Sequence, residues 1–462
     1  MNRTIIRRLV YPTYRRLKRD MVLGFLADMH RIERADLDEA REFQWLKVMA
    51  LLDHAAKHVP YYRRIFKEIG ATPGDFKGPD DLASLPVLRK EDVRNNLDDL
   101  VAEGQDRKRL EPDETGGSTG QNLFFYVDRR ATSAGLANAV RMNEWLGIRI
   151  GDSTASLWGI RFRRSRAQAF RSAIRDWVNN TTHIPAYKMD AETVRLQTER
   201  LMKLRPDVLV GFPSVLYHFA RTMPRCARAR LKPRVILSSG ETLFDWQCAE
   251  VEDAFGALVY NHYGSCEFRA IARECRVRAG LHVAIDRVLI ETLPVARAAS
   301  GEEIQEMVIT DLDNYGMPFI RYAIEDLGTI TWEACGCGLT LPRITNLGGR
   351  VYDVVRAPNG NYLGGTFWGH LLKEGVEKFQ VTQESLDEIV VALVPTGEFN
   401  DSVKAYVLDK VRKACGPLMK VRFDLRASID TTRTGKHRYV VSKIGASATA
   451  DHVVPSRRTP GA

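Results

Sequence analysis

Long apolar runs are absent from this chain of 462 residues, and none reaches the length that a membrane-spanning helix needs. We therefore expect no transmembrane segment. The basic start, MNRTIIRRLVYPTYRRLKRD, has apolar stretches interrupted by Arg and Pro, and no signal-peptide cleavage pattern follows it. These features predict a cytoplasmic protein.

Cysteine is also scarce. The chain has seven scattered cysteines, and an odd number without an export signal argues against a framework of disulfide bonds. A mixed composition, 44% hydrophobic and 27% charged, is typical of a globular protein that buries a large core.

Acidic residues are the minority, which leaves a net charge of +10. This charge suits acidic small molecules, nucleic acid or a membrane surface. Arginines crowd residues 161–175, with Phe162 and Phe170 among them, but no nucleic-acid-binding motif is recognisable. We expect no nucleic-acid partner and interpret this cluster as a solvated helix face, with a patch that steers a phosphorylated substrate as the alternative. Contact of the basic N-terminus with a membrane surface stays open as an alternative.

The hydrophobic pattern predicts a large and a small domain. Residues 43–70 have helical spacing, with Pro60 separating two helices. Three later segments, LRPDVLVGFPSVLYHFA, LKPRVILSSGETLFDWQCAEVEDAFG and ALVYNHYGSCE, have short apolar strands followed by polar turns, and the first two continue into helices. Such units are typical of a parallel sheet covered by helices, with the ligand outside the carboxyl ends of the strands. The loops GFPS, SSGE and NHYGSCE should therefore converge.

From about residue 280 the strands look antiparallel, and beyond Gly349 a strand–helix–strand pattern indicates a small α+β unit. The fold class is thus α/β. We predict a large N-terminal domain with parallel sheets and an antiparallel subdomain over residues 1–348. A small mobile C-terminal domain over 349–446 and a disordered tail over 447–462 would follow.

Several polar motifs are candidates for a ligand site. The loop from Thr115 to Gly120 has side chains no larger than a hydroxyl or methyl group, so its backbone N–H groups can surround an anion. It lacks the Lys that completes a Walker loop, and a flexible surface turn is the alternative. In HYGSCE, Tyr263 offers a stacking face and Glu267 a carboxylate suited to Mg²⁺. Asp326 could accept hydrogen bonds from a ribose diol.

The order of these motifs, followed by GGR at residues 348–350 and the Gly-Lys pair that contains Lys436, resembles that of the adenylate-forming enzymes. The chain is most similar to the phenylacetate-CoA ligase-like branch and, within it, to the capsular-polysaccharide-biosynthesis type. LLDHAAKHVPYYRRIF and LASLPVLRKEDVR contribute to this resemblance, which covers roughly residues 43–445.

The resemblance implies which residues contact ATP. The loop Thr115–Gly120 would hold the phosphates, with Ser265 contacting them as well. Tyr263 would stack on the adenine, Asp326 would take the ribose hydroxyls with help from Arg350, and Glu267 would bind Mg²⁺. The full set for ATP is Thr115, Gly116, Gly117, Ser118, Thr119, Gly120, Gly240, Glu241, Tyr263, Gly264, Ser265, Asp326 and Arg350, with Lys436 and Glu267 as the catalytic pair.

Two positions depart from the family pattern. Cys266 stands where the family often has Thr, which removes one hydroxyl contact. The hinge position, usually acidic, holds Tyr352 before Asp353, which puts the family's domain rotation in question.

Three of the cysteines form a separate motif with a histidine. Cys275, His282, Cys335 and Cys337 supply the ligand set of a closed tetrahedral Cys₃His zinc site, which would be structural. Reduced cysteines that never meet are the alternative. Similar Cys and His positions occur in some members of the resembled branch.

The resemblance implies a two-step enzyme. A carboxylic acid would be activated by Mg·ATP as an acyl-adenylate and then passed to a thiol, with coenzyme A expected first. A carrier-protein thiol, an amine, and a non-catalytic scaffold in surface-polysaccharide assembly are the alternatives. The acid itself is not specified, because Phe125, Trp158, Phe212 and Tyr217 fit an aromatic pocket or an ordinary core equally well.

Overall fold

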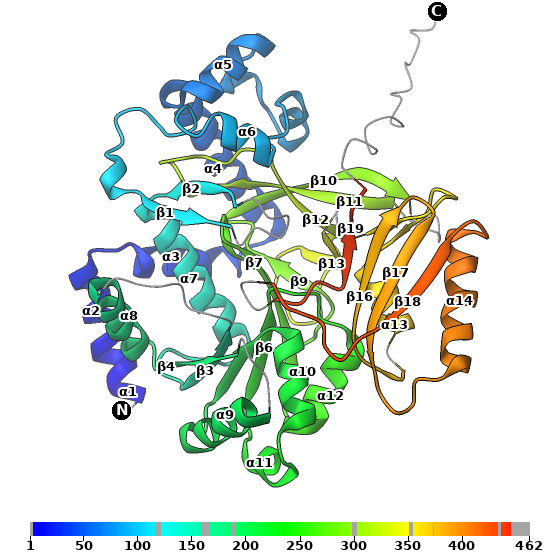
Figure 1. Cartoon of the computed structure of the whole chain (residues 1–462). Coiled ribbons are helices and arrows are strands. Elements are labelled where there is room, and N and C mark those ends of the chain that lie inside the picture. The colour runs from blue at the N-terminus through cyan, green and yellow to red at the C-terminus, as the bar shows by residue number, and fades with distance from the viewer. Residues whose placement is uncertain are drawn as a thin grey trace, which may run out of the picture. The chain divides into compact units, whose positions relative to one another are not determined.

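The fold was analysed in a computed structural model of the chain (Figure 1). The structure describes residues 3–115, 122–158, 166–186, 191–297, 303–350, 354–372, 374–432 and 436–444. By internal contacts the chain divides into two compact units. Unit 1 comprises Met1–Pro294, Gln305–Leu347 and Thr431–His437, and unit 2 comprises Val295–Ile304, Gly348–Asp430 and Arg438–Ala462.

One mixed sheet dominates the described part of the chain. It has eleven strands, and its two halves differ in direction. In spatial order the strands are β10 (Val288–Arg297), β11 (Glu303–Asp311), β12 (Tyr322–Thr331), β13 (Arg343–Arg350), β9 (Leu281–Val283), β8 (Arg269–Glu274), β7 (Val259–Ser265), β6 (Val235–Ser239), β5 (Val208–Gly211), β3 (Thr154–Trp158) and β4 (Thr181–Pro185).

The two halves of this sheet match the sequence expectation in strand direction. β4, β3, β5, β6 and β7 pair in parallel, and β7–β8, β8–β9, β13–β9 and β11–β12 pair antiparallel. The predicted α/β class is confirmed. The parallel part and the antiparallel part are nevertheless one sheet, because β8 turns back after β7 and continues the hydrogen-bonded ladder.

Helices cover both faces of the parallel half. On one face, α9 (Ala191–Leu204), α10 (Pro213–Thr222), α11 (Arg225–Arg230) and α12 (Asp245–Phe255) pack in a core with Ile236. On the other face, Val235 and Leu237 pack against Leu146, next to the C-terminal end of α7 (Arg129–Trp145). This alternation along β6 follows from the two-residue period of a strand buried on both sides.

The N-terminal helices pack on the antiparallel half in a second core. Pro60 separates two of them, as the sequence predicted: α4 ends at His58 and α5 begins at Pro60, where the missing N–H costs no hydrogen bond. The helices before the main sheet are α1 (Arg3–Ile5), η1 (Ile6–Val10), α2 (Tyr11–Lys18), α3 (Val22–Ile32), α4 (Leu37–His58), α5 (Pro60–Ile69), η2 (Pro73–Asp75), η3 (Pro79–Ser84), α6 (Lys90–Asn95) and η4 (Arg107–Arg109), and α8 (Arg166–Val178) lies between β3 and β4.

Unit 2 contains a four-stranded sheet with its own core around the buried Trp368. Its strands in spatial order are β18 (Lys420–Leu425), β17 (Glu388–Pro395), β16 (Val376–Ser385) and β19 (Val440–Ser442), and its helices are α13 (Gly365–Leu371) and α14 (Asp401–Cys415). Two short hairpins complete the strands: β1 (Glu111–Glu114) with β2 (Phe124–Val127), and β14 (Val355–Arg356) with β15 (Tyr362–Leu363). No helix in the described ranges is long and apolar enough to cross a membrane.

Candidate active site

Two of the loops expected to converge are joined by hydrogen bonds at the carboxyl ends of β5 and β6. Ser214, at the start of α10, donates its backbone N–H and its hydroxyl to the Glu241 carboxylate, both at 3.1 Å. Glu241 follows the SSG turn after β6. The carboxylate therefore ties the two strand ends together in the chain's parallel half.

Gly240 is required by the close approach of an aromatic ring. Its φ is +85°, and a Cβ built there would lie 2.8 Å from a ring carbon of Phe212. Any larger residue would meet both backbone strain and this ring. The turn after β6 thus presents bare backbone beside Phe212.

Lys436 lies over the same turn although it is almost two hundred residues further along the chain. Its Cε is 3.5 Å from the Cβ position of Gly240, and its ammonium is 5.8 Å from the centroid of the Phe212 ring. The next residue, His437, donates its backbone N–H to Glu241 at 2.7 Å. Thr432 fixes the lysine loop, since its hydroxyl accepts from the Lys436 N–H at 3.1 Å.

The Glu241 carboxyl is removed from water in this arrangement, and this desolvation raises its pKa. The hydrogen bonds from His437 and Ser214 and the positive charge of Lys436 oppose that shift. By accepting hydrogen bonds from Ser214 and His437, Glu241 holds the turn after β6 next to Lys436.

Tyr263 and Asp326 are brought together from β7 and β12. The Tyr263 hydroxyl donates to Asp326 Oδ2 at 2.7 Å, and Tyr263 is 8% exposed. The β7–β8 pairing shifts register between Tyr263 and Gly264, and a Cβ on Gly264 would collide with the Arg269 carbonyl oxygen. The bulge therefore needs glycine and sets the direction of the tyrosine.

The turn after β7 holds the predicted phosphate and magnesium residues. Ser265 Oγ accepts from the Phe268 N–H at 3.1 Å, so this hydroxyl also stabilises the turn. Glu267 is 7% exposed, and the Tyr322 hydroxyl donates to its Oε1 at 3.1 Å. Within the described residues no donor contacts its second oxygen, so a hard carboxylate oxygen of the kind Mg²⁺ prefers is present.

Cys266, where the resembled enzymes often have threonine, lies close to charged groups of the site. Although Cys266 is exposed, partial desolvation and the negative charges of Glu267 and Asp113 raise the pKa of its thiol, and Lys436 and Arg269 oppose that shift. The lysine, the carboxylates and the thiol consequently share one electrostatic environment.

The β1–β2 hairpin contacts this turn and ends at Thr115, the first residue of the glycine-rich stretch. Asp113 in β1 forms an ion pair with Arg269 at 2.8 Å. Thr115 closes the hairpin: its N–H donates to the Leu123 carbonyl, and its hydroxyl accepts from the Leu123 N–H, both at 3.0 Å. Gly116, Gly117, Ser118, Thr119 and Gly120 lie outside the described residues.

Three other predicted features belong to unit 2 or fall outside the described residues. Arg350 is the last residue of β13 and belongs to unit 2. The hinge residues Tyr352 and Asp353 lie outside the described ranges, as does the tail 447–462.

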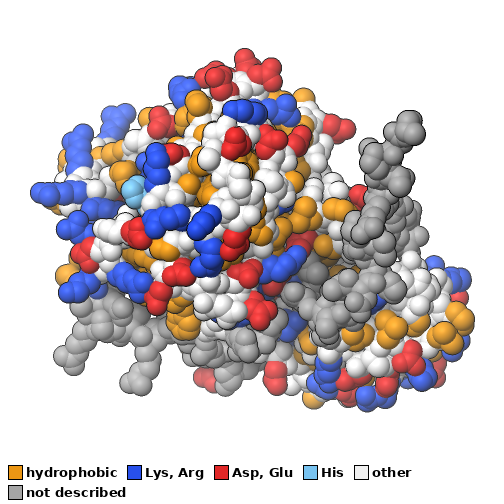
Figure 2. Space-filling view, turned by 90° about the horizontal axis from the view of Figure 1, so that it is seen from above, with side chains coloured by type: hydrophobic (Ala, Val, Ile, Leu, Met, Phe, Trp, Pro, Cys, Tyr) orange, Lys and Arg blue, Asp and Glu red, His pale blue; other side chains and the backbone are white. Residues whose placement is uncertain are grey.

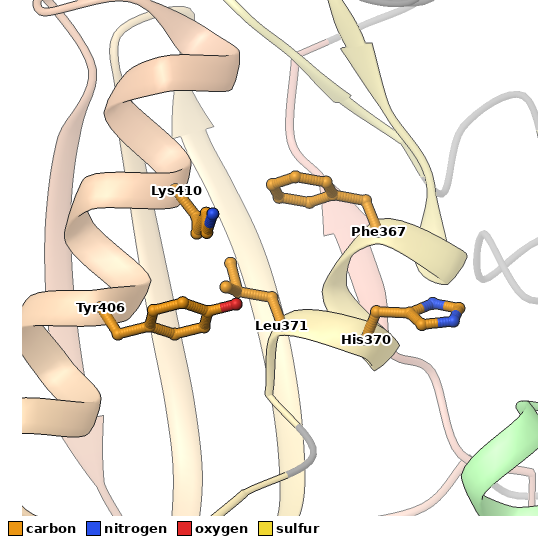
Figure 3. Close-up of a pocket in the computed structure, with 5 residues that line it drawn as sticks. All are labelled: Phe367, His370, Leu371, Tyr406 and Lys410. Carbon is orange, nitrogen blue, oxygen red and sulfur yellow. The ribbon is translucent and has the colours of Figure 1, made fainter.

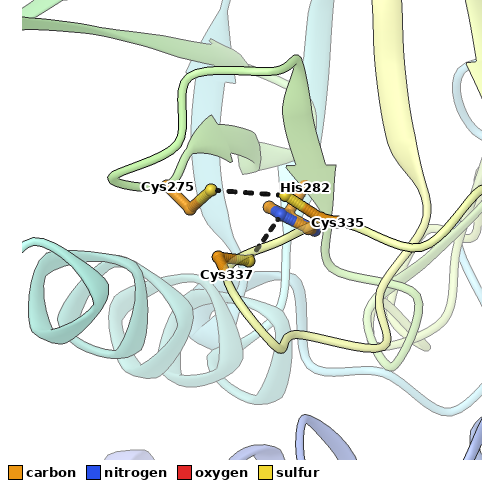
Figure 4. Close-up of side chains that lie close together, drawn as sticks. All are labelled: Cys275, His282, Cys335 and Cys337. Atoms are coloured by element: carbon orange, nitrogen blue, oxygen red, sulfur yellow. Dashed lines mark hydrogen bonds between the residues drawn. The ribbon is translucent and has the colours of Figure 1, made fainter.

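The four predicted zinc ligands come together in unit 1, with all ligand atoms within 4.8 Å of one another (Figure 4). The sulfurs of Cys275 and Cys335 are 3.8 Å apart, and Cys337 Sγ lies 3.3 Å from His282 Nε2. A tetrahedral ion with Zn–S bonds of about 2.3 Å would separate its ligands by roughly 3.5–3.8 Å. The donor set and its spacing therefore fit Zn²⁺.

The contact of His282 Nδ1, the ring nitrogen that faces away from the cysteines, supports a zinc site. His282 Nδ1 lies 2.9 Å from the Leu341 carbonyl oxygen, to which it can only donate. Nε2 is then left unprotonated and points toward the cysteines, as a metal-binding histidine requires.

The four candidate pocket aromatics do not share one environment. Phe125 is buried in the core under the N-terminal helices, whereas Phe212 and Trp158 are in ring contact, with centroids 4.3 Å apart, in the core of the parallel half. Tyr217 packs edge-on against Trp246. Among the described residues, Phe125 and Phe212 therefore belong to different hydrophobic cores.

Unit 2 has a hollow of its own, of about 470 Å³, between α13 and α14 (Figure 3). Its lining residues are Phe367, His370, Leu371, Tyr406 and Lys410. Sequence analysis gave no signal for it.

Sequence reasoning also missed two supporting residues, Ser214 and Tyr322. Ser214 stands within the quoted GFPS loop, but the partners Glu241 and Glu267 lie 27 and 55 residues away from Ser214 and Tyr322. No local pattern specifies such pairs.

Comparison with known proteins agrees with this architecture. Residues 359–443 match the family model of the CapK C-terminal domain. The chain is 23% identical to Protein CapK of Staphylococcus aureus over 424 residues, which cover 87% of this chain and 89% of that protein. It is 25% identical to the phenylacetate-coenzyme A ligase of Thermus thermophilus over 350 residues, 70% of this chain and 73% of the relative.

Among solved structures, the chain is similar to 2-hydroxyisobutyryl-CoA ligase in the postadenylation state, with a TM-score of 0.71, 19% identity, and coverage of 91% of this chain and 92% of that one. The large sheet and the C-terminal unit therefore have the fold of that ligase. The protein is a homologue of Protein CapK and the phenylacetate-CoA ligases, with the fold of the adenylate-forming superfamily.

Proposed function

We propose that this protein activates a carboxylic acid with ATP as an acyl-adenylate and then transfers the acyl group to a thiol, coenzyme A first. The observation that carries the proposal is the position of Lys436 against the Gly240–Glu241 turn, at the sheet edge where α/β folds bind ligands. The acyl-CoA ligases among the relatives support the same class of reaction.

The nucleotide would lie along the ends of β6, β7 and β12. Tyr263 would offer its ring to the adenine, and Gly240 would allow the base to approach the backbone. Asp326, already hydrogen-bonded by Tyr263, would accept the ribose hydroxyls through its remaining acceptor sites. Arg350 would assist the ribose, and Glu241 would border the adenine as it holds the turn.

The triphosphate would be bound by the loop that Thr115 begins, with Ser265 beside it. Backbone N–H groups of Gly116–Gly120 would take the β- and γ-phosphate oxygens. The free oxygen of Glu267 would hold Mg²⁺, which supplies positive charge to the phosphates when bound.

In the first step an oxygen of the acid's carboxylate attacks the α-phosphorus. A phosphorus–oxygen bond forms, the bond to the β-phosphate breaks, and pyrophosphate leaves with its electron pair. No protein nucleophile is needed, because the work is to position two anions and to stabilise the charge on the α-phosphate. Lys436 would bridge the carboxylate and an α-phosphate oxygen.

In the second step a thiolate attacks the acyl carbon and AMP leaves. Coenzyme A is the proposed acceptor, since the ligases named among the relatives are coenzyme A ligases. The proposed small domain, residues 349–446, would move between the two steps. A carrier-protein thiol or an amine is the second candidate acceptor.

We also propose that Cys275, His282, Cys335 and Cys337 hold a structural Zn²⁺. Four protein ligands complete a tetrahedron and leave no position for a substrate, so the ion would stabilise the β8–β9 region without entering the reaction.

The deciding experiment is acid-dependent ATP–pyrophosphate exchange with a panel of aryl, fatty, amino and sugar acids. Exchange with one class would support the proposal and identify the substrate class. Exchange with none of them would favour the non-catalytic scaffold. The similarity to Protein CapK over most of the chain is compatible with that alternative. Product analysis with coenzyme A, a carrier protein or an amine would then distinguish the acceptors.

A further inference from the structure

The N-terminal helical segment exposes an apolar stripe that its own fold does not cover. Over residues 3–18 the chain is helical, and Ile6 and Tyr11 face the protein. Ile5, Leu9 and Leu17 lie on the outer side and are 49%, 64% and 79% exposed. A helix that buries one apolar stripe normally presents polar residues on the opposite face. This segment has apolar residues on its outer face as well as on its buried face.

Basic residues flank that outer stripe. Residues 3–19 contain seven Arg and Lys side chains and no acidic one. Arg8, Arg16 and Arg19 are exposed, and none of the three has a carboxylate partner among the described residues. The outer face thus combines leucines with unpaired positive charge.

A second exposed apolar face occurs on α8. Phe170, Ile174 and Trp177 follow one another at spacings of four and three residues, which places them on the same side of the helix. They are 68%, 38% and 57% exposed. Arg171 and Arg175 are exposed beside them. Two large aromatic side chains in water on one helix face are unusual for a face without a partner.

The two helices are neighbours. Asn180, just after α8, donates its side-chain amide to the Gly151 carbonyl at 2.9 Å, and a Cβ built on Gly151 would lie 2.9 Å from the Arg3 carbonyl oxygen and 3.2 Å from the Ile6 Cβ, at the start of the N-terminal helix. Figure 1 shows α8 beside α1 and α2 on the same side of unit 1. Figure 2 shows the face seen from above, where Lys and Arg side chains lie interspersed with Asp and Glu side chains.

We propose that these two faces together form a docking surface for an anionic lipid bilayer. Arginines around Leu, Phe and Trp are the composition of helices that lie in the membrane interface, where the apolar side chains enter the acyl boundary and the basic ones meet lipid phosphates. Aromatic rings such as those of Phe170 and Trp177 favour this depth. A second copy of the chain is a poorer occupant, because two basic faces would repel each other.

The test is flotation of the full-length protein with vesicles of phosphatidylglycerol and phosphatidylcholine, compared with vesicles of phosphatidylcholine alone. Two double variants remove the apolar contacts: Phe170→Ser with Trp177→Ser, and Leu9→Ser with Leu17→Ser. We expect wild type to bind the anionic vesicles and each double variant to bind at least about tenfold more weakly. High salt should weaken the wild-type binding.

A matched control is Leu46→Ser with Leu418→Ser, which also removes two exposed leucines, 61% and 70% exposed, from elsewhere on the chain. It should bind as wild type does. Wild type that does not float with anionic vesicles overturns the proposal, as does unchanged binding of both double variants. Self-association that the double variants abolish, without vesicle binding, would assign the surface to a second copy. Circular dichroism of each variant shows whether it is folded, and a double variant that is not is replaced by its two single substitutions.

Discussion

Replacement of Lys436 by alanine tests the proposed chemistry most directly. The backbone around position 436 should keep its place in the variant, because Glu241 keeps its hydrogen bonds from Ser214 and from the His437 N–H. The effect should therefore fall on the reaction and leave the fold intact. Loss of the ammonium would also raise the pKa of the Glu241 carboxyl further, since Lys436 is one of the groups that oppose its shift.

The expected magnitude follows from the charge that is lost. At about 4 Å and an effective dielectric constant of about 20, one positive charge is worth roughly 4 kcal/mol to one negative charge. Removal of a single well-placed donor from a developing oxyanion typically costs about 3 kcal/mol. At about 1.4 kcal/mol per factor of ten, Lys436→Ala should slow adenylation on the order of a hundredfold or more.

The assay separates the two half-reactions. ATP–pyrophosphate exchange reports adenylation, and thioester formation from a supplied acyl-adenylate reports transfer; only the first should fall by the full factor. Lys443→Ala is the matched control, because it removes an exposed lysine of the same charge that pairs with Glu384 at 2.6 Å. Exchange by Lys436→Ala at the rate of Lys443→Ala would refute the assigned role.

Three further predictions concern the nucleotide, the metal and the strand end. Tyr263→Phe removes the hydroxyl that donates to Asp326, so the KM for ATP should rise about tenfold with kcat nearly unchanged; a fall in kcat alone would contradict this. Cys335→Ser should reduce bound zinc from about one ion per chain to almost none and lower the Tm, as metal analysis and calorimetry would show, whereas the exposed Cys226→Ser should change neither. Burial and the neighbouring Arg273 hold the pKa of His262 well below its ordinary value. As the pH falls, the His262 imidazole therefore becomes protonated in the unfolded chain but not in the native state. Stability should therefore fall by about 1 kcal/mol between pH 7 and 5.5, and less in His262→Asn; equal pH slopes in denaturant titrations would disprove it.

Local sequence pattern was sufficient for the elements that depend on near neighbours. The consecutive apolar residues Val235, Ile236 and Leu237 predict a strand buried on both faces, and Pro60 predicts a helix start. The signals arise within a few residues, where backbone sterics and burial periodicity act. They also indicated which strand ends carry polar turns.

These local patterns did not predict that the parallel and antiparallel strands form one sheet. Whether β8 continues the sheet of β7 or begins another depends on the hydrogen-bonded register at Tyr263 and Gly264, and this register is fixed by packing across the whole edge. The separation of Phe125 from Phe212 has the same origin, since an apolar side chain gives no indication of which core it enters.

The sequence by itself determined which groups are available: the small loop from Thr115, the carboxylates, the late lysine and the set of three cysteines and one histidine. Only the tertiary structure decided that Lys436 lies against Gly240, that Tyr263 donates to Asp326, and that the four metal-ligand atoms share one small volume. The physical reason is separation along the chain. Contacts between residues tens to hundreds of positions apart are set by how whole elements pack, and no nearby pattern in the sequence encodes them.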